Sequence, residues 1–128
     1  MKKIEIANQY KKEWKEWLSN PTENWKFPEA KETLGDAQRR AIKKLKEIIS
    51  SYKAEDIICI ITHGNIIRLI LCFLLNMDIS NMLKFHQFNG SITSFEYIGD
   101  KVKIHSINDV CHLKGLEFAD SITGKPWH

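Results

Sequence analysis

The sequence lacks the cysteine patterns of a disulfide-stabilised or zinc-binding protein. It has three cysteines, Cys59, Cys72 and Cys111, an odd number, and two of them lie inside apolar runs. No Cys-x-x-Cys motif or paired Cys/His spacing is present, and these are the usual patterns of zinc sites. We therefore expect small buried hydrophobic residues in a reducing compartment, no metal site, and a cytoplasmic protein.

Long hydrophobic runs are also absent. The longest apolar run, Ile66 to Leu75, contains Arg68 and is far shorter than the roughly 20 residues that a membrane span needs. The N-terminal sequence MKKIEIANQY has lysines but no apolar stretch behind them, so it does not have the pattern of a signal peptide. The sequence predicts neither a membrane protein nor a secreted one.

An excess of charge of one sign is missing as well. The formal net charge is +3. Residues 1–53 contain 13 Lys and Arg against 8 Asp and Glu, and the remainder contains 6 against 8. This mildly basic N-terminal part favours anionic substrates but is too weak to indicate nucleic-acid binding. No motif in the chain requires a cofactor.

The 128 residues, of which 43% are hydrophobic, are sufficient for one compact domain. In its first part, alternation predicts a short strand over Met1–Ile6, and helical spacing predicts a helix over Asn8–Ser19 with Trp14 and Trp17 in the core. A loop over residues 22–31 follows. Thr33 and Asp36 then fit a capping box that opens a helix running to about Tyr52.

The central stretch, DIICIITHGNIIRLILCFLLNM, contains two apolar segments of different kinds. Ile57–Ile61 is short and β-branched, without alternation, which is typical of a strand buried on both faces of a parallel sheet. Ile66–Leu75 is too long for such a strand and predicts a helix, and a short helix or turn is expected over Ser80–Phe85. The helix before Ile57 would then be a crossover that leads into the parallel sheet.

The C-terminal part has the pattern of a β-hairpin. Ser91–Ile98 and Lys101–Ile107 are rich in β-forming residues, and the two residues between them, Gly99 and Asp100, predict a tight turn. No clear period follows Leu113. We therefore expect a domain over residues 1–113 and a C-terminal tail over residues 114–128.

His63 is the main candidate for a functional residue. It lies between the predicted strand and the predicted helix, where ligands bind in open α/β sheets because helix N–H groups are available to an anion. Gly64 would allow close approach of a ligand, and Asn65 would cap the helix with its side chain. The residues alone fit an ordinary strand-to-helix turn equally well.

Arg68 and Glu32 are possible supporting residues. Arg68 interrupts an apolar helix, and the residues favour a structural role in which it binds a carboxylate or carbonyl groups inside the fold. Glu32 precedes the helix cap at Thr33, and the residues favour a solvated acid over one that faces a ligand.

Several motifs, taken in order, resemble the histidine phosphatase superfamily. They are Thr62-His63-Gly64 with Ile67-Arg68, then Asn89-Gly90-Ser91-Ile92-Thr93, then Asn108-Asp109 through His112-Leu113. Upstream, Pro28 to Leu34 is similar to the segment of the family that ends in Gly-Glu-Ser, with lysine and threonine replacing glycine and serine. The resemblance covers about residues 14–113 and is closest to the α-ribazole and broad-specificity phosphatases. It implies the second half of a three-layer α/β/α phosphoglycerate mutase-like fold.

The resemblance also implies a mechanism. In this family a nucleophilic histidine attacks phosphorus, while a second histidine and two arginines neutralise the phosphoryl oxygens. His63 matches the second histidine, and Asn65 falls where some members contact substrate; Gly64 is predicted to bind substrate because it allows close approach. The nucleophile of the family lies in an Arg-His-Gly tripeptide on the first strand, and this chain has no His-Gly other than His63-Gly64.

By resemblance, the absent first strand would lie between the strand of His63 and the Ser91–Ile98 strand, in the centre of the sheet. We therefore expect either that Met1–Ile6, a second copy or another chain fills the gap, or that this is a truncated copy that has closed up differently. The resemblance predicts hydrolysis or transfer of the phosphoryl group of a small phosphomonoester, provided that a nucleophile is supplied. The alternative is a catalytically inactive anion-binding or assembly protein of the same fold, so enzyme activity of this chain stays open.

Overall fold

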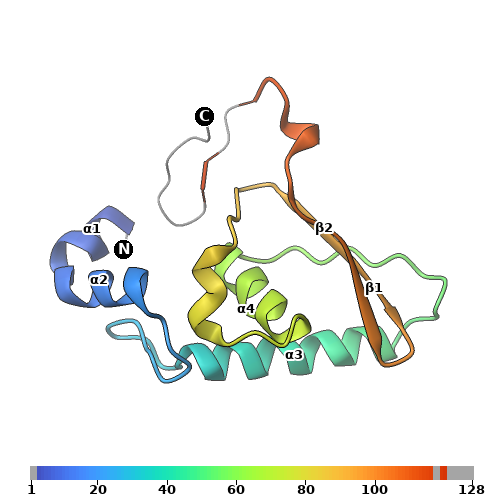
Figure 1. Ribbon diagram of the computed structural model, residues 1–128, viewed down its shortest axis with the longest axis horizontal. Coiled ribbons are helices and arrows are strands. Elements are labelled where there is room, and N and C mark those ends of the chain that lie inside the picture. The colour runs from blue at the N-terminus through green and yellow to red at the C-terminus, as the bar shows by residue number, and fades with distance from the viewer. Residues whose placement is uncertain (1–2, 117–118, 121–128) are drawn as a thin grey trace.

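The computed structural model describes residues 3–116 and 119–120. Two short helices, α1 (Lys3–Gln9) and α2 (Lys11–Ser19), lead through a loop into the long helix α3 (Leu34–Ser50). Helix α4 (Gly64–Leu74) packs on α3, and the 3-10 helix η1 (Ile79–Lys84) packs on α4. A hairpin of β1 (Ile92–Ile98) and β2 (Lys101–Asp109) follows, and then the 3-10 helix η2 (Cys111–Leu113). In Figure 1, α1 and α2 lie together at one end of the molecule, and the hairpin lies on the other side of α4.

The N-terminal segment is helical, so the prediction of a strand over Met1–Ile6 is wrong for the described residues Lys3–Ile6. Two isoleucines around one glutamate are too short a pattern to separate strand from helix. The backbone instead continues into α2, because Tyr10 N donates to Ile6 O at 2.9 Å and Trp14 N donates to Tyr10 O at 2.9 Å. The predicted helix over residues 8–19 is confirmed as α2.

Aromatic residues join α2 to the loop that follows it. Trp17 is 1% exposed and lies 5.2 Å from Trp25 and 5.0 Å from Phe27, measured between ring centroids. This cluster packs against residues of α3, α4 and η1 in one hydrophobic core. The loop over residues 22–31 is confirmed, and through Trp25 and Phe27 it contributes to the core.

The capping box at the start of α3 is confirmed. Asp36 N donates to Thr33 Oγ1 at 3.1 Å, and Thr33 N donates to Asp36 Oδ2 at 3.0 Å. The loop before α3 supplies two further acceptors, since Leu34 N donates to Trp25 O at 2.9 Å and Gly35 N donates to Glu23 O at 2.8 Å. The first-turn N–H groups of α3 are therefore used within the chain.

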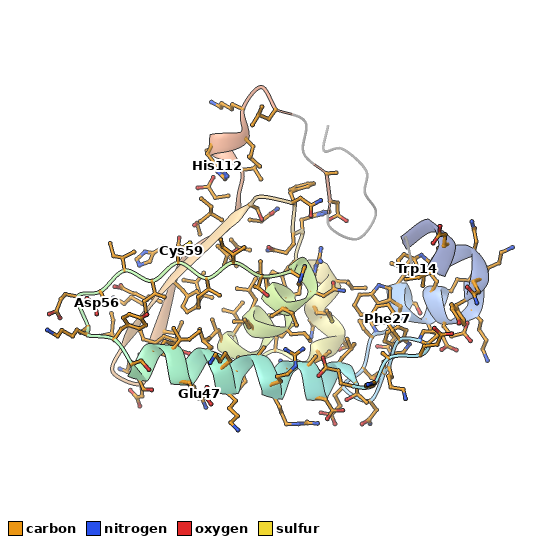
Figure 2. All side chains as sticks on the ribbon, turned by 180° about the vertical axis from the view of Figure 1, so that it is seen from behind. Trp14, Phe27, Glu47, Asp56, Cys59 and His112 are labelled. Atoms are coloured by element: carbon orange, nitrogen blue, oxygen red, sulfur yellow. The ribbon has the colours of Figure 1, made fainter. Side chains whose placement is uncertain are left out.

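The segment Ile57–Ile61 is extended but is not a strand, and it is exposed, so the prediction of a buried strand is wrong for this chain. A strand needs a neighbour, and no described residue pairs with this segment. Figure 2 shows Asp56 and Cys59 along this connection between α3 and α4. Cys59 and Cys111 are exposed, so burial was predicted correctly only for Cys72.

The hairpin is confirmed, with Ile98 opposite Lys101 and Tyr97 opposite Val102 in antiparallel register. Gly99 has φ of 63°, a backbone conformation that glycine adopts without strain. Along β2 exposed and half-buried residues alternate, so one face meets solvent as expected. Among the described residues the sheet has these two antiparallel strands, in place of the expected parallel pairing.

Helices and strands together give the mixed α/β class that the sequence predicts. None of the helices described has the length and apolar character of a membrane span.

Candidate functional site

His63 lies at the start of α4 and is its N-cap residue. Its backbone is extended, with φ of −94° and ψ of 152°, and its side chain is exposed and makes no capping hydrogen bond. No hydrogen bond or ion pair joins the imidazole to another residue in the described part of the chain. The ring is therefore available to a ligand.

The first turn of α4 differs from that of α3 in its backbone N–H groups. Ile67 N donates to His63 O at 3.0 Å, but the N–H groups of Gly64, Asn65 and Ile66 have no acceptor among the described residues. Free N–H groups at a helix N-terminus, together with the helix dipole, favour a bound anion. His63 and these three amides lie next to one another in the sequence at the start of α4.

Asn65 has a different role from the predicted side-chain cap. The cap position belongs to His63, and the Oδ1 of Asn65 accepts a hydrogen bond from Arg68 Nη1 at 3.2 Å. The prediction assigned the cap two residues too late, as happens when a boundary is inferred from residue type alone. Gly64, the first residue of α4, and Asn65 remain next to His63, and their substrate contacts remain a prediction.

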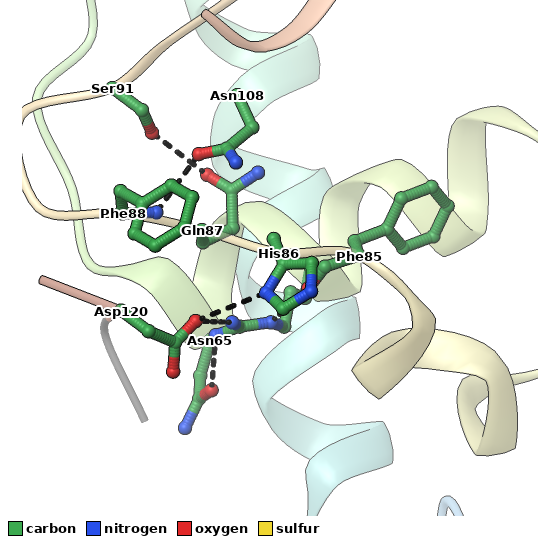
Figure 3. A network of polar contacts seen from close by, with 9 residues as sticks. Asn65, Phe85, His86, Gln87, Phe88, Ser91, Asn108 and Asp120 are labelled. Atoms are coloured by element: carbon green, nitrogen blue, oxygen red, sulfur yellow. Dashed lines mark hydrogen bonds and ion pairs between the residues drawn. The ribbon is translucent and has the colours of Figure 1, made fainter. Parts of the chain in front are cut away.

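Arg68 is a buried charged residue of α4, 1% exposed. Its Nε donates to Phe85 O at 2.9 Å, and its Nη2 lies 3.6 Å from Asp120 Oδ2 (Figure 3). Burial lowers the pKa of the guanidinium, and the Asp120 carboxylate acts in the opposite direction. Arg68 thus has the favoured structural role, because it joins α4 to the segment after η1.

Asp120 was not identified as a candidate from the sequence. Its carboxylate is buried, lying 3.6 Å from both Arg68 Nη2 and His86 Nδ1, and the His86 ring stacks on Phe88 at 5.8 Å between centroids (Figure 3). Its backbone also bridges to Phe88. Asp120 lies in a segment without periodicity, so no local pattern identifies it. The one signal in the sequence was Arg68, because a buried arginine needs a carboxylate or another acceptor nearby.

The motifs after η1 lie side by side in the fold. Asn108, with φ of 57°, accepts a hydrogen bond from Phe88 N through its Oδ1 at 2.9 Å. Asn108 N donates to Thr93 Oγ1 at 3.2 Å, and His112 Nε2 lies 2.8 Å from Gly90 O. The segments 89–93 and 108–113, which are separate in the sequence, therefore support each other through polar contacts.

Glu32 is an exposed acid that pairs with Arg40, and a supporting role in the site stays a prediction. Its carboxylate binds Arg40 through two contacts, to Nη2 at 2.6 Å and Nε at 3.1 Å, and both side chains are exposed. Hydrogen bonding with Arg40 lowers the pKa of Glu32. This agrees with the solvated acid that the residues favoured. In the described residues no group of three His, Cys, Asp or Glu side chains has the arrangement of a metal site.

The chain belongs to the histidine phosphatase superfamily (branch 1), whose sequence pattern matches residues 1–110. The resemblance inferred from the motifs is thus confirmed.

Two relatives define the comparison further. A protein of Hydrogenobacter thermophilus named "Putative phosphoserine phosphatase 2" is 28% identical over 100 residues, which cover 78% of this chain and 47% of that protein. The crystal structure of a phosphoserine phosphatase mutant from Entamoeba histolytica, in complex with phosphoserine, has the same fold, with a TM-score of 0.67 and 22% identity. That match covers 80% of this chain and 51% of the other. The chain therefore spans about half the length of both relatives.

Proposed function

We propose that this chain provides the second-histidine part of a histidine phosphatase site and takes part in hydrolysis of a small phosphomonoester when a nucleophilic histidine is supplied. The observation that carries the proposal is the exposed His63 ring at the cap of α4, next to three N–H groups without an acceptor among the described residues. Family membership supports the assignment of this surface to phosphate.

The chemistry follows from charge. A phosphoryl group carries negative oxygens, and a protonated imidazole with backbone N–H groups neutralises them without proton transfer. The attacking nitrogen would come from the Arg-His-Gly histidine of the family, which would bond to phosphorus as the bond to the leaving alcohol breaks. An acid would protonate that alcohol, and water would then release phosphate from the phosphohistidine. His63 stabilises charge in both steps and is not itself the nucleophile.

The substrate class is a phosphomonoester of a small alcohol, and phosphoserine is the first compound to examine. Support comes from the two relatives, whose names describe phosphoserine phosphatases. The position of Asn65 beside His63 is consistent with a contact to the substrate, through its backbone N–H or its side-chain amide nitrogen, because its Oδ1 already accepts from Arg68.

Anion binding at His63 is testable on the chain alone. We expect inorganic phosphate or vanadate to shift the NMR signals of the His63 ring and of the Gly64 and Asn65 amides. His63→Ala should reduce anion affinity by about tenfold or more, since one charge-assisted contact is lost. His105→Ala is the matched control, because His105 is also exposed and contacts Glu96 on the hairpin. Equal affinity of the two variants would contradict the assignment.

A turnover assay distinguishes the phosphatase function from that of an inactive anion-binding protein. The chain alone should not hydrolyse phosphoserine or a generic phosphomonoester, because it has no second His-Gly. Robust turnover by the chain alone that is abolished by His63→Ala would contradict the need for a second nucleophile. Phosphate binding without turnover, even in the presence of the complementary half, would favour the inactive anion-binding protein.

A further inference from the structure

A groove with a volume of about 390 Å³ lies where α3 and α4 pack together. Its lining comes from these two helices and consists of Gln38, Arg39, Ile42, Lys43, Lys46 and Phe73. Arg39, Lys43 and Lys46 follow one another at intervals of four and three residues, so they fall on one face of α3. The charged residues that line the groove are therefore all basic.

The apolar surface of the groove is supplied by Phe73. This residue is 40% exposed, whereas Ile42 is 6% exposed and belongs to the floor. Lys46 Nζ lies 5.3 Å from the centroid of the Phe73 ring, which is a cation–π distance. Gln38 Nε2 donates to Leu69 O at 2.9 Å and so holds α3 against α4 at the groove. The groove thus combines an accessible aromatic ring with cations on a fixed pair of helices.

Two of the three cations are not neutralised within the described part of the chain. Arg39 pairs with Asp36 at 2.6 Å, whereas neither Lys43 nor Lys46 forms an ion pair with a described residue. Like charges on neighbouring turns of a helix repel one another. A partner that brings carboxylates to this face would relieve the repulsion, and an apolar side chain on Phe73 would remove further surface from water.

We propose that this groove docks an acidic peptide segment of a partner protein. One large apolar side chain of the segment packs against Phe73, and carboxylates on either side of it pair with Lys43 and Lys46. Charge complementarity carries this choice of occupant, because opposite potentials across an interface favour encounter and exclude partners of the wrong charge.

Other occupants fit the groove less well. A small organic anion is normally bound in a cavity that covers most of its surface, whereas Phe73 and the lysines here are exposed. A single-stranded nucleic acid is normally bound along a basic channel with several stacking rings, and this groove has one ring.

The groove is separate from the proposed phosphate site. Phe73 follows His63 by ten residues of helix, which is about 15 Å along the axis of α4. The docking proposal therefore does not depend on the proposed function. His63→Ala should bind an acidic peptide like the unaltered chain while it loses affinity for phosphate.

The test is an NMR titration of the isotope-labelled chain with the synthetic peptide Glu-Asp-Glu-Phe-Glu-Asp-Glu. We expect shifts of the Lys43, Lys46 and Phe73 signals and an affinity that falls as salt is added, because exposed charges are screened. Lys43→Glu and Lys46→Glu should each weaken binding by about fivefold or more, because attraction becomes repulsion. A peptide with alanine in place of phenylalanine should bind about tenfold more weakly, because it has no apolar anchor.

Lys44→Glu is the matched control. It makes the same charge change on the same helix, but Lys44 lies outside the groove lining and pairs with Glu47 at 3.5 Å. All three lysines are exposed, so the variants should keep the circular dichroism spectrum of the unaltered chain. Lys44→Glu should change the affinity for the peptide by less than about twofold.

Several results would overturn the proposal. Absence of shifts at the groove would do so, and so would equal losses for Lys44→Glu and Lys46→Glu, which indicate general charge attraction. Equal affinity of the phenylalanine and alanine peptides would remove the role of Phe73. Tighter binding of 2-naphthoate or of a single-stranded oligonucleotide at the same residues would replace the peptide by a small anion or a nucleic acid. A dimer of the chain that shifts these signals without peptide would replace it by a second copy.

Discussion

The thiol of Cys72 is enclosed in the core between α4 and its neighbours, and burial raises its pKa to about 11. The thiolate is the reactive form, so Cys72 should resist alkylation in the folded chain. At pH 8 we expect iodoacetamide to modify Cys59 and Cys111, which are exposed, well before Cys72. Peptide mass spectrometry measures the order, and urea-unfolded protein, in which all three should react, is the control. Modification of Cys72 as fast as Cys59 in the native chain would contradict its placement.

Through the Asp36 carboxylate at the start of α3, the stability of the folded chain depends on pH. Its pKa is lowered by the hydrogen bond from Thr33 N and by that from Arg39, so the folded state prefers the charged form. The stabilisation is present above the ordinary carboxyl pKa and is lost as the pH falls through the lowered value. Asp36→Asn should therefore destabilise the chain at pH 7, and its difference from the unaltered chain should shrink in acid, below about pH 4.

Urea unfolding at several pH values measures this difference. Thr33→Ala, which removes the hydroxyl acceptor of the same box, should cost about 1 kcal/mol. A stability difference for Asp36→Asn that is the same at pH 7 and in acid would show that its charge has no part in the effect.

At the scale of elements, Arg68 holds α4 to the segment after η1 and to Asp120. Arg68→Met should lower the free energy of unfolding by about 3–5 kcal/mol, because it removes the buried cation next to the Asp120 carboxylate. Arg40→Met is the matched control. The Arg40 pair with Glu32 is exposed, and such pairs contribute about 0–1 kcal/mol.

Urea unfolding followed by circular dichroism measures both variants. Similar losses for Arg68→Met and Arg40→Met would mean that Arg68 contributes no more than a surface ion pair. The NMR titration with phosphate gives a second readout, since a displaced start of α4 would weaken binding at His63.

The sequence correctly predicted those elements whose structure is determined by residues close together in the chain. The capping box at Thr33, helix α4 and the turn at Gly99 are each determined within a few residues, and each is confirmed. The segment 57–61 has a strand composition, but pairing depends on a partner strand that local sequence does not specify. The contact of Asp120 with Arg68 joins residues 52 positions apart, and no local pattern marks it.

At the scale of the whole molecule, the family was identifiable from several short motifs that follow one another in the order typical of the family. The roles of His63, Gly64 and Asn65 in binding stay predictions. The division into a domain over residues 1–113 and a tail also stays a prediction. Asn89 N donates to Ala119 O at 3.0 Å, so a part of the expected tail contacts the domain, and residues 121–128 lie outside the described part. Cytoplasmic localisation still rests on the sequence alone.

The exposed segment between α3 and α4 has a consequence for the lifetime of the chain. Proteases cleave most readily where the backbone is accessible and free of hydrogen bonds, and residues 57–61 meet both conditions. Limited proteolysis of the folded chain should therefore cut first within residues 57–61, between α3 and α4.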